Sequence, residues 1–228
     1  SHIDHVFGNP YLKKEGATII AQEKVLDGYY KIPPAFNMTT YEYNLDLLKR
    51  QDPTQAGKLL PEGEEACGKP DITFTDQLTL KLGEHTFQCF HTPGHSPEQT
   101  SVYVPEERCV FVGDNIFNNC QIWFHSADFD ALFHSLDWLQ GLDVDYIVPG
   151  HGPIKGKECI VENKQFIYAW LDAVGEGITK GGSQEECVKR ISFADRCPMD
   201  IGQPECMEYV QTHNVRKCYE YLTRSAER

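Results

Sequence analysis

The chain has 228 residues, of which 40% are hydrophobic, so it is long enough to bury a full core in one large domain or two small ones. Its formal net charge of −13 argues against nucleic acid or an anionic membrane surface as a partner, because no local basic patch offsets the repulsion. No run approaches about 18 apolar residues, so the sequence is not expected to span a membrane.

The first five residues, SHIDH, bring two histidines and an aspartate close together. His2 and Asp4 would share one face of a strand that His5 opposes, and no helical stripe contains all three, so we expect a loop that directs them to one point. Imidazole and carboxylate groups are ligands of borderline-soft metal ions. The segment therefore indicates one half of a metal site.

Short strands are predicted for the middle of the sequence. A strand within GATIIAQEKV (residues 16–25) precedes a helix over residues 39–51, which Pro53 ends, and a loop that continues to residue 70. Residues 71–117 then alternate apolar and polar side chains in short pieces that are broken at turns containing glycine or proline. This pattern predicts a meander of antiparallel strands.

Helical periodicity returns after residue 127. Residues 128–144 predict a helix that Gly141 stops, and YIVPGHG (residues 146–152) predicts one more strand. The buried face of that helix is assigned to Leu132, Phe133, Leu136 and Leu139. Further helical patterns occupy residues 160–174, 184–191 and 205–222. Without repeats or linkers, residues 1–228 are expected to form a single α+β domain, of which residues 157–228 are a C-terminal helical portion.

Three further possible metal ligands follow predicted strands, and each lies beside a glycine. They are His95 in HTPGHSP, Asp114 in FVGDNIF and His151 in VPGHGPI. A strand that stops at a turn places the next side chain at the rim of the sheet, where several rims converge on one point. The ordered set, from His2 onward, predicts a common metal centre.

This ordered set resembles the metallo-β-lactamase-fold hydrolases, whose signature His-x-His-x-Asp-His is followed by a histidine after a turn, a bridging aspartate and a last histidine. The resemblance implies a four-layer αββα sandwich and covers residues 1 to about 154. His2, Asp4 and His5 match the end of the opening signature, and the first histidine would precede Ser1. We therefore expect a fragment that lacks the opening strands, and any signal peptide would lie in the missing part. A separate N-terminal piece could supply the missing histidine.

The resemblance also implies how the ligands divide between two metal ions. The absent histidine, His2 and His95 would hold one ion, whereas Asp4, His5 and His151 would hold the other, and Asp114 would bridge both. A hydroxide between the ions would be the nucleophile, because a metal-bound water has a pKa of about 7 instead of ~15.7. Asp4 would orient this nucleophile and accept its proton. Zn²⁺ is favoured, although Mn²⁺ or Fe²⁺ suits the same nitrogen and oxygen ligands.

Residues after the bridging aspartate are candidates for the substrate pocket. The segment NNCQIWFHSADFD places Trp123, Phe124 and His125 near the metal centre, unless Trp123 and Phe124 are ordinary core residues under a loop. His213 is assigned to the solvated face of a C-terminal helix. These assignments do not identify the substrate.

The function expected from the resemblance is hydrolysis of a small ester, thioester or lactone, as in the glyoxalase II-like and lactonase-like branches. The alternatives are a phosphoester or sulfate-ester hydrolase, a sulfur dioxygenase with a single iron, and a scaffold that binds metal only structurally. Nine irregularly spaced cysteines without a CxxC pair favour reduced thiols, and with them a cytoplasmic location. The expected partner is a small-molecule substrate, and the oligomeric state is left open.

Overall fold

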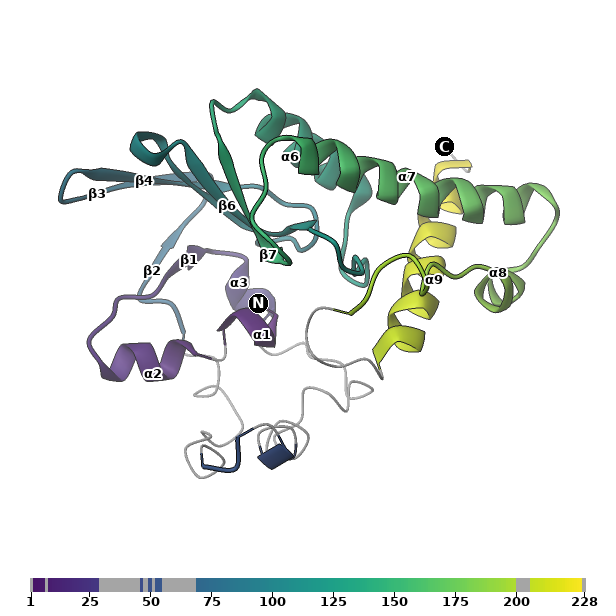
Figure 1. Cartoon of the computed structure of the whole chain (residues 1–228), viewed down its shortest axis with the longest axis horizontal. Coiled ribbons are helices and arrows are strands. Elements are labelled where there is room, and N and C mark those ends of the chain that lie inside the picture. The colour runs from purple at the N-terminus through teal and green to yellow at the C-terminus, as the bar shows by residue number, and fades with distance from the viewer. Residues whose placement is uncertain are drawn as a thin grey trace. The chain divides into compact units, whose positions relative to one another are not determined.

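A computed structural model describes residues 2–6, 8–28, 69–199 and 206–226, together with 46, 49–50 and 52–54. The chain comprises two compact units, Ser1–Asp76 and Gln77–Arg228, which Figure 1 colours from purple to yellow along the sequence. Most of the predicted helix at residues 39–51 and of the loop after it lies outside the described residues. A single domain over residues 1–228 stays a prediction. No helix in the described ranges is long and apolar enough to cross a membrane.

The described part of the first unit consists of short elements. Two strands, β1 (Ile20–Gln22) and β2 (Ile72–Phe74), pair in parallel, with Ile20 opposite Ile72. The expectation that residues 71–74 open the antiparallel meander is therefore wrong. The Asp71 carboxylate explains the pairing, because it accepts a hydrogen bond from the Ile19 amide at 2.9 Å and holds the starts of the two strands together. The helices are α1 (Ile3–Val6), α2 (Asn9–Lys14) and α3 (Val25–Gly28).

The N-terminal segment is helical where a loop was predicted. Residues Ile3–Val6 form one turn, α1, and the His5 amide donates a hydrogen bond to the His2 carbonyl at 3.1 Å. Asp4 lies in the first turn, where a carboxylate is stabilised by the exposed amides of the helix start. The loop prediction was wrong because it assumed that a helix must place His2, Asp4 and His5 on one face, which a single helical turn need not do.

The second unit is built on a five-stranded sheet with the order β3-β4-β5-β6-β7. The first four strands are antiparallel, so the predicted meander is confirmed from residue 77 onward. The last strand, β7, lies parallel to β6 after a helical crossover, α6. The strand bounds are Gln77–Leu82, His85–His91, Thr100–Val104, Cys109–Phe117 and Tyr146–His151.

Four helices and a short 3₁₀ turn, η3 (Pro105–Glu107), complete the described part of the second unit (Figure 1). The Asp128 side chain caps the crossover helix α6 by accepting a hydrogen bond from the Ala131 amide at 3.1 Å. The predicted helices after residue 127 are all confirmed. They are α6 (Phe129–Gly141), α7 (Glu158–Thr179), α8 (Gln184–Arg190) and α9 (Met207–Ala226).

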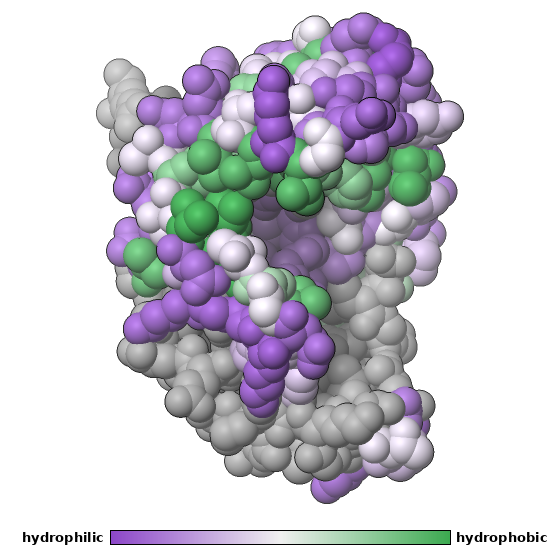
Figure 2. Space-filling view, turned by 90° about the vertical axis from the view of Figure 1, so that its left-hand side faces the viewer, coloured by the Kyte–Doolittle hydropathy of each residue, from purple (hydrophilic) through white to green (hydrophobic). Residues whose placement is uncertain are grey.

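The sheet has apolar side chains on both faces. Val110 and Val112 of β6 and Ile147 of β7 are fully buried, and β6 contacts α6 and α7. Side chains alternate between faces along a strand, so Phe111 lies on the opposite face, where it is 46% exposed. Figure 2 looks at the side where β3 and β4 lie and shows hydrophobic residues gathered in one area of that surface. In the strand register, Phe111 pairs with Val102 of β5 and with Val148 of β7. The same row continues through Cys89 of β4 to Leu78 of β3.

The topology brings three predicted ligands to one edge of this sheet. Strands β4, β6 and β7 run in the same direction, because β4 and β6 are both antiparallel to β5 and β7 is parallel to β6. Their carboxyl ends therefore lie at a common edge. His95 follows the end of β4, Asp114 lies in the second half of β6, and His151 is the last residue of β7.

Candidate metal centre

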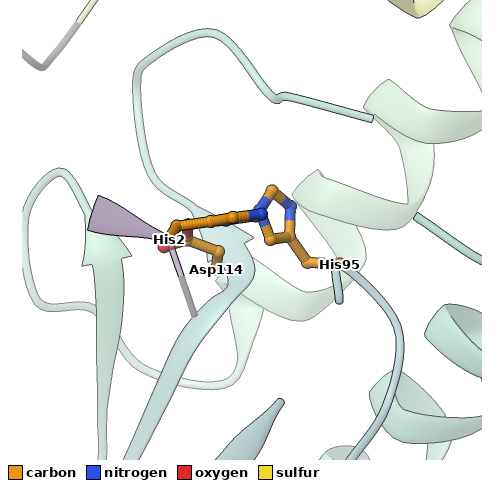
Figure 3. Close-up of side chains that lie close together, drawn as sticks. All are labelled: His2, His95 and Asp114. Carbon is orange, nitrogen blue, oxygen red and sulfur yellow. The ribbon is translucent and has the colours of Figure 1, made fainter. Parts of the chain in front are cut away.

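The Asp114 carboxylate lies between two imidazoles of the second unit. Its Oδ2 atom is 3.3 Å from His95 Nε2, and its Oδ1 atom is 3.6 Å from His151 Nε2. Each carboxylate oxygen therefore faces a different histidine, which is the arrangement expected of a bridging ligand. Figure 3 shows the His95 ring directed toward Asp114.

These separations suit ligands of a shared ion better than direct hydrogen bonds. Two ligand atoms at about 2.1 Å from a tetrahedral ion lie about 3.4 Å apart, whereas an N–H···O hydrogen bond has its mode near 2.9–3.0 Å. The observed 3.3 and 3.6 Å bracket the metal value. The donor set of two imidazoles and one carboxylate fits Zn²⁺, Mn²⁺ or Fe²⁺.

The carboxylate fits a space that only glycine leaves open. A Cβ atom at Gly150 would lie 1.9 Å from Asp114 Oδ1 and 2.8 Å from the backbone carbon of Gly113. Asp114 and His95 are both buried, with 6% and 2% of their surfaces exposed. Burying a carboxylate without compensating charge is costly, so this environment requires cationic partners. A divalent metal ion held by the two neutral imidazoles would supply this charge.

The turn that carries His95 is held by hydrogen bonds to every one of its carbonyl groups. This turn, residues 92–95, joins β4 to the residues that lead into β5. Fixing each carbonyl fixes the backbone from which the His95 ring projects. The donors to residues 92, 93, 94 and 95 are, in order, Asn115 Nδ2 at 2.7 Å, Ser135 Oγ at 2.6 Å, the Asp128 amide at 2.8 Å and Ser126 Oγ at 2.8 Å.

Asn115 links this turn to the bridging carboxylate. It follows Asp114 directly, is 3% exposed, and donates from Nδ2 to the Thr92 carbonyl. Its Oδ1 atom accepts from the His95 amide at 3.0 Å. One amide side chain therefore satisfies a donor and an acceptor of the turn, and it couples the position of His95 to that of Asp114. Gly94 permits this approach, because a Cβ there would lie 2.7 Å from Asn115 Oδ1.

His151 is fixed from the other side of the centre. Its ring stacks on Phe117 with a centroid separation of 5.1 Å and an interplanar angle of 18°. The His95 ring lies 5.6 Å from the same phenyl group, so Phe117 contacts both imidazoles. The Asn118 amide donates to the His151 carbonyl at 3.0 Å. The end of β7 is thereby attached to the residue after β6.

The remaining predicted ligands belong to the first unit. His2 precedes α1 and is half-buried, whereas Asp4 and His5 lie in α1 and are exposed. Within this unit His5 Nε2 lies 3.4 Å from Asp4 Oδ2. That separation again matches two ligands on one ion. Their membership in a common centre with His95, Asp114 and His151 stays a prediction.

The three candidate pocket residues have different surroundings. His125 is half-buried, and its ring meets the His95 ring edge-on at 5.7 Å. Trp123 is also half-buried and lies 5.7 Å from His125. Phe124 is fully buried against Phe129 and Trp170 in the hydrophobic core, which is the alternative that the sequence left open.

Three residues that are linked to the candidate site through ring contacts or hydrogen bonds were not assigned to it from the sequence. Tyr209 of α9 lies 6.4 Å from Trp123 and stacks on His213 at 3.8 Å. His213 is half-buried and stacks on Tyr209, so it is less exposed than a fully solvated helix position would be. The helical spacing of Tyr209 and His213 is apparent in the sequence, but no neighbouring residue indicates that Tyr209 lies beside Trp123. Asn115 was inconspicuous because amide side chains are common in turns.

Comparison with known proteins identifies the family. The profile of the metallo-beta-lactamase superfamily matches residues 1–151. These residues include all six predicted ligands, from His2 to His151. The helices α7, α8 and α9 follow the matched part.

Curated relatives are hydrolases of different specificity. A linear primary-alkylsulfatase from Pseudomonas sp. (strain ATCC 19151) is 26% identical over 96% of this chain and 46% of its own. A type 2 metallo-beta-lactamase from Bacteroides fragilis is 29% identical over 50% of this chain and 48% of its own. A hydroxyacylglutathione hydrolase from Francisella tularensis subsp. novicida (strain U112) is 35% identical over 34% of this chain and 31% of its own. The chain thus spans less than half the length of these relatives.

A solved structure agrees with the fold. A metallo-beta-lactamase family protein from Thermus thermophilus superposes with a TM-score of 0.62 over 97% of this chain and 71% of its own, at 15% identity. This likeness confirms the predicted α+β metallo-β-lactamase fold. Together with the profile match, it shows that the chain belongs to the metallo-beta-lactamase superfamily.

Proposed function

We propose that this protein is a metal-dependent hydrolase that uses two divalent ions, preferably Zn²⁺, to cleave a small ester, thioester or lactone. The observation that carries the proposal is the Asp114 carboxylate, whose two oxygens face two different imidazoles at 3.3 and 3.6 Å. A carboxylate placed in this way can bridge two ions, and the relatives named above support hydrolysis as the reaction class.

The ligands divide into two sets in this proposal. His2 and His95 would hold one ion together with the first histidine of the family signature, Asp4, His5 and His151 would hold the other, and Asp114 would contact both. When bound, such ions lower the pKa of a coordinated water to about 7 and polarise the carbonyl oxygen under attack. Imidazole ligands add no negative charge, so the two carboxylates leave the pair with net positive charge.

The chemical step follows from these roles. Water oxygen forms a bond to the carbonyl carbon, Asp4 accepts a proton from that water, and the carbon–oxygen or carbon–sulfur bond breaks. The leaving alkoxide or thiolate takes up a proton, so the products are a carboxylic acid and an alcohol or thiol. The buried environment of Asp114 and His95 strengthens the electrostatic contribution of every charged group there.

A sulfate ester is the second candidate substrate. The alkylsulfatase relative aligns with 96% of this chain, whereas the hydroxyacylglutathione hydrolase aligns with 34%. The broader alignment includes the C-terminal helices, from which substrate contacts beyond the metal centre would come. Sulfate and carboxylate esters therefore belong in the same activity screen.

The experiment is a screen of the full-length protein after removal of metal and return of Zn²⁺, Mn²⁺ or Fe²⁺. Carboxylic esters, thioesters, lactones and alkyl sulfates are offered, and metal content is measured on the same sample. We expect hydrolysis of at least one class with two ions per chain, and a loss of at least about 100-fold in Asp114→Asn.

The matched control is His134→Ala, because His134 is an exposed histidine on α6 outside the proposed centre. It should retain activity and metal content, whereas His95→Ala and His151→Ala should lose both. Oxygen uptake with a single iron per chain, or activity that survives Asp114→Asn, would contradict the proposal.

A further inference from the structure

A continuous row of rings leads away from His95 in the second unit. It consists of His125, Trp123, Tyr209 and His213, and we call it the aromatic row. His125 meets His95 at 5.7 Å, Trp123 meets His125 at 5.7 Å, Tyr209 lies 6.4 Å from Trp123, and His213 stacks on Tyr209 at 3.8 Å. All four side chains are half-buried.

The row is held rigidly by polar side chains of α9. Asn214 accepts from the Phe124 amide at 2.8 Å and donates to the Ile122 carbonyl at 2.6 Å, so it fixes the backbone on both sides of Trp123. Gln211 donates to Gln121 Oε1 at 3.0 Å. Asn214 is 1% exposed and Gln211 is 6% exposed. Buried amides in these positions serve to fix the loop against the helix.

The far end of the row is fixed in the same way. The His213 ring stacks on Tyr209 with an interplanar angle of 22°, and His213 Nδ1 donates to the Tyr209 carbonyl at 2.9 Å. A surface whose side chains are already ordered loses little conformational entropy when it binds a ligand. The row therefore has the properties of a preformed binding surface for apolar groups, because ring faces are apolar and polarisable.

We propose that the aromatic row binds the apolar organic group of the substrate, so that esters with an extended alkyl or aryl acyl group are preferred over acetyl esters. The proposal rests on the proposed function, because the bond to be cleaved must lie at His95 and Asp114 for the rest of the substrate to follow the row. Tyr209 and His213 lie beyond residues 1–151 that the superfamily profile matches, so this specificity belongs to the C-terminal helices.

The test uses 4-nitrophenyl esters of straight-chain acids from acetate to octanoate, with the zinc-loaded full chain. We expect KM to fall about threefold to fourfold for each CH₂ group that the row buries, with little change in kcat. Trp123→Ala should raise KM for the octanoate ester at least about tenfold and leave KM for the acetate ester within about twofold. Trp123→Phe, which keeps a ring, should restore most of the preference.

The matched control is Trp138→Ala, because Trp138 packs on Phe90 at 4.9 Å and lies outside the row. It should keep the dependence of KM on chain length. A second readout needs no turnover: isothermal titration calorimetry measures the binding of hexanoate and octanoate to the metal-free protein. Octanoate should bind more tightly than hexanoate, and Trp123→Ala should abolish the difference.

The two proposals can fail separately. Hydrolysis with a KM that depends neither on chain length nor on Trp123 would overturn the aromatic-row proposal and leave the hydrolase proposal in place. Absence of hydrolysis, combined with fatty-acid binding that depends on Trp123, would overturn the hydrolase proposal and retain the row as an apolar binding surface. Fatty-acid binding that Trp123→Ala does not change would also overturn the aromatic-row proposal.

Discussion

Asn115→Ala tests how the second unit holds His95 in place. The change removes two hydrogen bonds, one of 2.7 Å to the Thr92 carbonyl and one of 3.0 Å from the His95 amide. Both residues are buried, so the two backbone groups lose their partners where water does not replace them easily. Each such group costs about 1–3 kcal/mol, so we expect the free energy of unfolding to fall by about 2–6 kcal/mol.

The melting temperature should fall by roughly 4–24 °C, because one kcal/mol corresponds to about 2–4 °C in a chain of this size. Urea unfolding is measured with a chelator present, so that lost metal binding does not contribute. In a separate titration against a chromophoric chelator, Zn²⁺ affinity should decrease about 10-fold to 100-fold, as for other residues that orient metal ligands.

Ser135→Ala is the matched control for this prediction. Ser135 donates one hydrogen bond to the same turn, at the Pro93 carbonyl, but contacts neither His95 nor Thr92 through that bond. Ser135→Ala should lower the free energy of unfolding by about 1 kcal/mol and leave Zn²⁺ affinity nearly unchanged. The coupling of His95 to Asp114 through Asn115 would be refuted if both variants lost the same stability and bound Zn²⁺ as the unaltered chain does.

Three further predictions concern glycine, charge and helix capping. Gly150→Ala should abolish tight Zn²⁺ binding, because its Cβ would lie 1.9 Å from Asp114 Oδ1, whereas Gly141→Ala, with nothing within 4 Å of its Cβ, should bind Zn²⁺ normally. Lys13 lowers the pKa of Asp71 by hydrogen bonding, so the Asp71 carboxylate stabilises the folded protein while it is ionised. Asp71→Asn should therefore reduce the melting temperature at pH 7 and make progressively less difference below about pH 4. A difference in melting temperature that persists at about pH 2 would contradict this. Ser183→Ala removes the capping box of α8 and should destabilise the second unit by about 1 kcal/mol in urea unfolding, with no effect on Zn²⁺ affinity.

Local patterns were sufficient for most elements of the second unit. The α6 helix followed from apolar side chains at helical spacing, and Leu132, Leu136 and Leu139 are indeed buried. The β7 strand followed from a short apolar run, although Pro149 and Gly150 lie within the strand and not in a turn that ends it. Such elements can be predicted because their cause lies within a few residues of sequence.

Longer-range pairing was not accessible in this way. The β1 and β2 strands are only three residues each and pair across about fifty intervening residues, so neither strand carries a pattern that names its partner. The α1 turn is too short for helical periodicity to appear. In both cases the structure depends on contacts that a local window does not contain.

The candidate site shows the same division. His95, Asp114 and His151 stood out because each combines a metal-ligand side chain with a neighbouring glycine at a predicted strand end, although β6 continues past Asp114 to Phe117. The supporting residues did not, because their partners are distant: Asn214 binds the backbone of Phe124 ninety positions away, and Tyr209 reaches Trp123 from α9. Candidate ligands can therefore be recognised in the sequence, whereas the residues that orient them can be identified only from the fold.

The most direct test of the proposed centre is anomalous X-ray diffraction at the zinc absorption edge from crystals of the zinc-loaded protein. The proposal predicts two anomalous peaks, one near His95 Nε2 and one near His151 Nε2, each at about 2.0–2.2 Å from a different carboxylate oxygen of Asp114. A single peak, or peaks that Asp114 does not contact, would contradict a two-metal centre bridged by this residue.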